Sequence, residues 1–237
     1  MSTTTKINNL IKEIMVSVSF DGEIGVDELE DRIKNSTVIK NTFNKTHDAF
    51  NTAVNLDPER TNTKTGKIGL VLQSGKKNKE ILRILKGMIS YHIMGHYVPT
   101  EKIAKAFQNY WTDLIGDEII SPKQITIRYV NFIPIGQEEK VEDVINLKID
   151  QPYENVDNEF YTNQFSIDDK KITVVFAFSS KTDSRGVYFD HSVKQILNES
   201  DSKNRIGEII QEIRPVKNKV FFTMLSDKTK NKYQWDI

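Results

Sequence analysis

Residues 125–133 read Ile-Thr-Ile-Arg-Tyr-Val-Asn-Phe-Ile, and the pattern of this stretch decides the fold class. Its odd-numbered positions hold isoleucine, tyrosine and asparagine, whereas Thr126 and Arg128 occupy even-numbered ones. A period of two is typical of a β-strand, whose successive side chains point to opposite faces. The stretch therefore predicts a strand in which Arg128 and Asn131 lie on opposite faces of a sheet.

The same alternation recurs elsewhere in the chain. Residues 14–20 alternate aliphatic or aromatic side chains with methionine and serine. The apolar segment 80–93 is divided by Lys86-Gly87, a pair that predicts a hairpin. The remaining predicted strands are 46–54, 68–73, 160–167, 172–179 and 186–190, with Asp168-Asp169-Lys170 as a tight turn.

Three segments show helical spacing instead. Apolar residues fall on one stripe in 26–33 and in 99–116, where Thr100 is the expected cap and Gly116 the stop. A C-terminal helix is expected to begin near Ser202 and to kink or restart at Pro215. Shorter helical pieces are predicted over 138–145 and after a Ser226 cap.

These elements predict an α+β fold, a curved antiparallel sheet with helices on one face. Both halves follow the order strand, helix, several strands, helix, so the fold is consistent with two pseudo-repeated halves. We expect a single domain over 1–237, with halves at 10–118 and 119–226 and a C-terminal tail at 227–237.

Composition limits the classes of function. The 237 residues include 33 basic and 33 acidic ones, so no overall charge draws the chain to nucleic acid. Cysteine is absent, which excludes disulfides, thiolate metal sites and a cysteine nucleophile. Apolar runs are strand-sized and no targeting signal is visible, so we expect a cytoplasmic protein with no membrane partner.

No catalytic constellation emerges from the sequence. His92 and His96 are four residues apart, but Ile93 stands where a zinc protease needs glutamate, and Gly95 disfavours a helix. The turn at 73–79 contains Gly-Lys without the glycine-rich cradle of a P-loop. We therefore predict no catalytic residues, no metal and no cofactor, and lean towards a protein that is not an enzyme.

Candidate binding residues come from two places. Arg128 is a charged residue in an apolar strand, for which a structural salt bridge is the favoured explanation. Residues 203–232 hold eight basic against three acidic residues, followed closely by aromatic ones. The predicted binding set is Arg128, Lys217, Lys219, Lys228, Lys230, Lys232, Tyr233 and Trp235.

The strand 125–131 and the segment Val220-Phe221-Phe222-Thr223-Met224-Leu225-Ser226 resemble a family of sporadically distributed, uncharacterised bacterial proteins. Members of that family open on a strand like 14–20, carry an Arg-Tyr-hydrophobic-Asn strand and close on a helix with paired aromatics. Many also place a histidine in the last helix, where this chain has Glu212, Arg214 and Pro215. The resemblance implies a setting in mobile-element and phage-defence neighbourhoods and no particular reaction.

Together these features predict a non-enzymatic protein-interaction subunit of a bacterial antiviral defence or toxin–antitoxin system. Its partner would be a protein encoded nearby or a second copy of the chain. A metal-dependent enzyme acting on nucleic acid and a nucleic-acid-binding module are the alternatives, and nucleic acid is the less favoured partner.

Overall fold

One antiparallel sheet organises the chain. The computed structural model describes residues 10–22, 24–56, 61–75, 79–116, 120–146, 160–179, 185–198 and 203–233. Within them, nine strands form an open sheet in the order β2-β3-β4-β5-β1-β6-β9-β8-β7. The strands are β1 (Ile11–Asp21), β2 (Lys45–Leu56), β3 (Thr61–Gln73), β4 (Glu80–Leu85), β5 (Met88–Met94), β6 (Ser121–Pro134), β7 (Phe160–Ile167), β8 (Lys170–Ser179) and β9 (Gly186–Ile196).

Four of the five described α-helices agree with predicted positions, with local differences, whereas the helix over 37–42 was not predicted. The helices are α2 (Val26–Asn35), α3 (Thr37–Thr42), α4 (Thr100–Ile115), α5 (Ile206–Met224) and α6 (Asp227–Tyr233), with 3-10 turns at Val141–Asp143 and Lys203–Arg205. The predicted helix over 138–145 is only this first short turn, and the predicted strand 186–190 extends to Ile196. Thr100 is the first residue of α4 and not its cap.

Helix α5 continues through Pro215, so the predicted restart at this residue is wrong. Apolar side chains on both sides of the proline, including Ile213 and Val220, remain buried. Packing of this stripe against the sheet outweighs the hydrogen bond that proline removes. Ser226 does cap α6, because its Oγ accepts a hydrogen bond from the backbone N–H of Thr229 at 3.1 Å.

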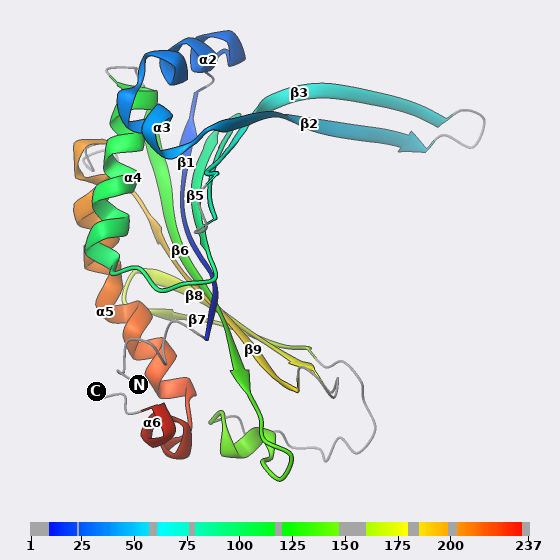
Figure 1. Cartoon of the computed structure of the whole chain (residues 1–237), viewed down its shortest axis with the longest axis vertical. Coiled ribbons are helices and arrows are strands. Elements are labelled where there is room, and N and C mark those ends of the chain that lie inside the picture. Colours follow the sequence, from blue (N-terminus) through cyan, green and yellow to red (C-terminus); the bar gives the residue numbers. More distant parts are fainter. Residues whose placement is uncertain are drawn as a thin grey trace.

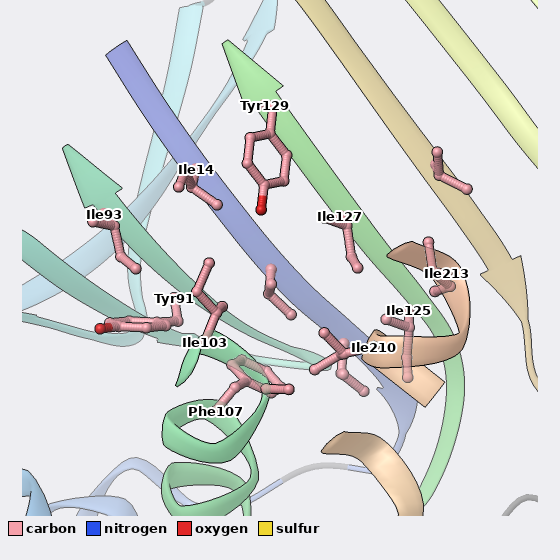
Figure 2. Packing of buried hydrophobic residues seen from close by; sticks show 14 of the residues in the cluster. Ile14, Tyr91, Ile93, Ile103, Phe107, Ile125, Ile127, Tyr129, Ile210 and Ile213 are labelled. Atoms are coloured by element: carbon pink, nitrogen blue, oxygen red, sulfur yellow. The ribbon is translucent and has the colours of Figure 1, made fainter. Parts of the chain in front are cut away.

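The hydrophobic core lies between the sheet and the two long helices. Figure 2 shows Ile103 and Phe107 of α4 facing Tyr91 and Ile93 of β5. Farther along the sheet, Ile210 and Ile213 of α5 lie over Ile125 and Ile127 of β6. All eight side chains are buried, so the alternating strands and the helical stripes enclose one continuous core.

The sheet is strongly curved, and its two faces differ in what covers them. In Figure 1, α4 and α5 run along the convex side, whereas the β2–β3 hairpin and the β7–β9 strands bend away from these helices. On the side of the sheet away from α4 and α5, Figure 1 shows no described element between the two bent ends. We call the sheet surface on this side the concave face.

Gly69 is a point of close approach between β3 and β4. A Cβ at this position would lie 2.0 Å from the carbonyl oxygen of Ile84, which is backbone and cannot rotate away. We expect Gly69→Ala to lower the free energy of unfolding by about 1–3 kcal/mol in urea denaturation, as forced overpacking does. Gly66→Ala, on the same strand with nothing within 4 Å of its Cβ, is the control and should be nearly neutral. Equal effects of the two variants would contradict this account.

Candidate binding face of the sheet

Strand register determines which side chains reach the concave face. Val16 and Val18 of β1 point to the helices, so the residues between and beside them, such as Met15, Ser17 and Ser19, point the other way. Cross-strand pairing places side chains of neighbouring strands beside one another, in two rows that cross the middle of the concave face. One row consists of Arg83, Ser90, Ser17, Thr126, Lys194 and Lys171, and the other of Ile81, His92, Met15, Arg128, Ser192 and Thr173.

A polar network crosses the four central strands of this face. His92 Nδ1 and Glu13 Oε1 are 2.6 Å apart, and His92 Nε2 lies 3.0 Å from Ser90 Oγ. On the other side, Arg128 donates to both carboxylate oxygens of Asp190, with Nη2 to Oδ2 at 2.6 Å. Arg128 Nη1 is 3.9 Å from Glu13 Oε2, which links the two groups.

Hydrogen bonding in this network favours its charged forms. The hydrogen bond from His92 holds the pKa of Glu13 below its usual value, helped by the charges of His92 and Arg128. The hydrogen bonds to Asp190 raise the pKa of Arg128. The network therefore fixes a guanidinium in the middle of the concave face.

The side-chain contacts of a Ser-His-acid triad join Ser90, His92 and Glu13. The access for a substrate and the oxyanion hole that a catalytic triad needs are not found around them in the described part of the chain. Ser90 is only 2% exposed and His92 only 6%, so a substrate cannot reach the hydroxyl. Ser90 also lies within β5, where the described backbone N–H groups serve the ladders with β4 and β1 and supply no oxyanion hole. We conclude that these residues stabilise the face and do not form a nucleophilic site.

Charge is distributed unevenly over the concave face. By register and ring contact it carries six basic side chains, Lys12, Lys45, Arg83, Arg128, Lys171 and Lys194, among the described residues. The described acidic residues there are Glu13, Asp190 and, at the end of β1, Asp21, which is paired with Lys123. The whole chain has equal numbers of basic and acidic residues. Positive charge is thus concentrated on the face that none of the described helices covers.

Two of these lysines oppose each other directly. Lys171 of β8 pairs in register with Lys194 of β9, and neither has a carboxylate partner within the described part of the chain. Like charges opposite each other across strands are destabilising. The pair borders a hollow of about 440 Å³ that is also lined by Gln164, Ser166 and Thr173. Two lysines on a polar hollow attract negative charge, which makes the hollow a candidate site for an anionic group.

An aromatic row lies at the β7–β9 end of the same face. Register places Phe160, Ala177, Tyr188 and Phe132 side by side. Phe160 is 76% exposed and Tyr188 39% exposed, while Lys12 Nζ lies 5.3 Å from the centroid of the Phe132 ring. Exposed aromatic rings beside cations offer surfaces on which a planar ligand stacks.

The predicted binding residues do not form one surface. Arg128 lies on the concave face and Asn131 is buried on the helix side, as the alternation predicts. Lys217 lies on the buried side of α5, whereas Lys219 is exposed on the same helix. Trp235 lies outside the described residues.

Residues near the C-terminus are mostly paired within the chain. Lys228 lies 3.5 Å from Asp143, Lys230 3.0 Å from Asp227 and Lys232 3.0 Å from Glu139. Tyr233 ends α6 and is only 9% exposed, so it does not belong to a free tail. Local acidic partners therefore neutralise much of the basic segment.

Two polar residues, His191 and Lys217, are buried on the helix side, and only Lys217 was in the predicted binding set. His191 follows the inward alternation of Val187, Phe189 and Val193, and this pattern predicts its burial. Lys217 was in the set as a surface lysine, but it is spaced four residues after Ile213 and three before Val220. That spacing places it on the buried stripe of α5, which the sequence already indicated.

The burial of the Lys217 side chain lowers the free energy of unfolding of the protein. Burial, together with the charge of Arg214, lowers the pKa of Lys217 to about 7. Above pH 7 the Lys217 amine therefore holds its proton more often in the unfolded chain than in the folded one. The free energy of unfolding should rise with pH from about 7 to 9 for this reason. We expect Lys217→Met to abolish this rise and to raise stability at pH 7 by about 1–4 kcal/mol. Lys219→Met is the control, and an unchanged pH profile in Lys217→Met would contradict the assignment.

Other features of the described residues narrow the chemistry. No group of three or more histidine, aspartate or glutamate residues is arranged to hold a metal in the part of the chain that the structure describes. None of the described helices combines the length and apolar character needed to cross a membrane. No protein-family model matches the chain, and no curated protein matches it either.

Proposed function

We propose that this chain is a non-catalytic binding module that holds double-stranded nucleic acid against its concave face. The observation that carries the proposal is the separation of charge. Basic side chains collect on a curved sheet face that no described helix covers, in a chain with no net charge. A polyanion is the partner that such a face attracts, because each neutralised phosphate releases bound counterions.

Size and shape support a duplex. Nine strands spaced about 4.8 Å apart give an arc of roughly 40 Å. One turn of B-form DNA is about 34–36 Å long, so the arc matches one helical turn. A duplex that runs along the direction of strand order would therefore contact the sheet over about one turn, between the bent ends that Figure 1 shows at β2–β3 and β7–β9.

The polar and aromatic residues of the face support the same partner. Thr126, Ser192 and Thr173 offer hydroxyl groups between the basic residues. Side chains of this kind contact sugar and phosphate oxygens. The row that contains Phe160 and Tyr188 supplies the apolar surface with which sheet-based proteins wedge between base steps.

The order of the elements favours two similar halves. One half runs from β1 through α2 and four strands to α4, and the other from β6 through β7–β9 to α5. Their first strands, β1 and β6, are neighbours at the centre of the sheet. A duplicated module of this kind would present two related surfaces to the two strands of a duplex.

A protein partner, in the defence or toxin–antitoxin setting that the sequence resemblance implies, is the second candidate. The observation that favours it is the exposure of Phe160 and Tyr188, because aromatic residues are enriched at protein interfaces. The polar and basic composition of the rest of the concave face favours nucleic acid. If the natural partner is a protein, the chain should bind duplexes only weakly at every salt concentration.

Fluorescence anisotropy with a labelled duplex of about 20 base pairs tests the proposal. We expect the duplex to bind. A plot of the logarithm of its association constant against the logarithm of the salt concentration should have a slope of about −3 to −5, as for four to five phosphate contacts. Absence of binding at 50 mM salt, together with co-purification of a protein encoded nearby, would replace this proposal with the second candidate.

Bound duplex should be recovered intact. The described residues provide no metal cluster and no accessible nucleophile with an oxyanion hole. We therefore expect no cleavage of DNA or RNA in Mg²⁺ or Mn²⁺ over hours, measured on denaturing gels. Turnover that follows the protein peak in gel filtration, and is lost on substitution of one carboxylate, would show that the protein is an enzyme.

A further inference from the structure

A second site lies on the opposite side of the sheet, under α5. A cavity of about 140 Å³ is lined by Tyr129, Asn131, His191, Lys217, Phe221 and Phe222, among others. Tyr129 and Asn131 come from β6, His191 from β9 and the rest of these from α5. The cavity is thus built where the 125–131 strand meets the paired aromatics of the last long helix.

Buried polar atoms of His191 lack hydrogen-bond partners in this cavity among the described residues. His191 is 1% exposed, and neither ring nitrogen has a hydrogen-bond partner among the described residues. Its ring is sandwiched between Tyr129, at 5.8 Å between centroids, and Phe221, at 5.5 Å. Burial lowers the pKa of His191 to about 3, so the imidazole is neutral and can donate one N–H and accept at the other nitrogen.

Lys217 brings a cation to the same cavity. Its Nζ lies 4.0 Å from the centroid of the Tyr129 ring, and no carboxylate pairs with it in the described part of the chain. The nearest charged groups are Arg214 of α5 and Glu101 of α4, which form an ion pair with each other. Burial of an ammonium group without a carboxylate partner costs free energy, and an anion in the cavity would offset this cost.

We propose that this cavity binds a small organic monocarboxylate, with the carboxylate against Lys217 and His191 and the apolar group against Phe221 and Phe222. One cation and one neutral N–H match the single charge of a carboxylate. Inorganic phosphate carries more negative charge near pH 7 than Lys217, the one cation among the described lining residues, can neutralise. The volume is close to the 150 Å³ of a cavity that holds benzene, which suits a ligand of about six heavy atoms.

NMR titration of the His191 ring resonances with butyrate tests the proposal, and butyramide serves as the uncharged isostere. We expect saturable shifts with butyrate at about millimolar concentration and at least tenfold weaker binding of butyramide. Affinity for butyrate should fall about tenfold per pH unit above pH 7, as Lys217 loses its proton. His191 and Tyr129, with pKa values of about 3 and about 12, do not titrate in this range.

Two variants on one helix separate the site from general charge effects. Lys217→Met should remove butyrate binding and its pH dependence, whereas Lys219→Met, on the exposed side of α5, should retain both. Lys217→Met is expected to fold, because methionine fits a buried apolar position. Equal binding of butyramide, retained binding in Lys217→Met, phosphate binding as tight as that of butyrate, or no saturation at about 100 mM butyrate would each overturn the proposal.

Discussion

Replacement of Phe107 by alanine is expected to lower the free energy of unfolding by about 3–5 kcal/mol. Phe107 is fully buried in α4 and faces Tyr91 and Ile93 across the helix–sheet interface, as Figure 2 shows. Removing the ring leaves a cavity between layers that the long strands hold in place, so the core cannot collapse to fill it. Urea denaturation followed by circular dichroism measures the change.

Asn109→Ala provides the matched control on the same helix. Asn109 is exposed two residues away from Phe107, so its truncation removes no core contact. Alanine also has the higher helix propensity, and the control should be neutral or slightly stabilising. A Phe107→Ala variant as stable as the control would show that α4 does not anchor the sheet.

Reversal of charge at two points of the concave face should weaken duplex binding about a hundredfold at 0.1 M salt. Arg83→Glu/Lys171→Glu changes both ends of one cross-strand row, which removes two attractive charges and adds two repulsive ones. The protein should not lose stability at position 171, because a glutamate there faces Lys194 and replaces a like-charge pair with an ion pair.

Lys102→Glu/Lys105→Glu makes the same change in net charge on α4, where both lysines are exposed on the convex side. This control should alter affinity less than threefold, since long-range effects are screened at this ionic strength. Equal losses in the two double variants would mean that only net charge matters and that the concave face is not the binding surface.

Local patterns predicted most of the fold. The alternation in 125–133 identified β6 and the opposite directions of Arg128 and Asn131, and Lys86-Gly87 identified the β4–β5 hairpin. The helical stripe in 99–116 identified α4 and its buried face. Each of these depends on neighbours within a few residues, which the sequence displays directly.

The composition of the concave face could not be predicted in the same way, because strand order depends on the pairing of segments that are distant in sequence. Lys171 and Lys194 are opposite each other only because β8 pairs with β9. Arg128 meets Asp190 across 62 residues of sequence. The basic residues near the C-terminus were included in the predicted binding set because they are close in sequence. In the structure, Lys228 and Lys232 are paired with acidic residues from the 139–143 region.

Protection of a single introduced thiol tests the central claim, binding of a duplex to the concave face, most directly. The chain has no cysteine, so Thr126→Cys places one thiol in the middle of that face and Lys105→Cys places one on the convex side. With saturating 20-base-pair duplex, we expect maleimide labelling at position 126 to slow at least tenfold and labelling at position 105 to remain unchanged. Unchanged labelling at position 126, in a variant that still binds the duplex, would contradict the account.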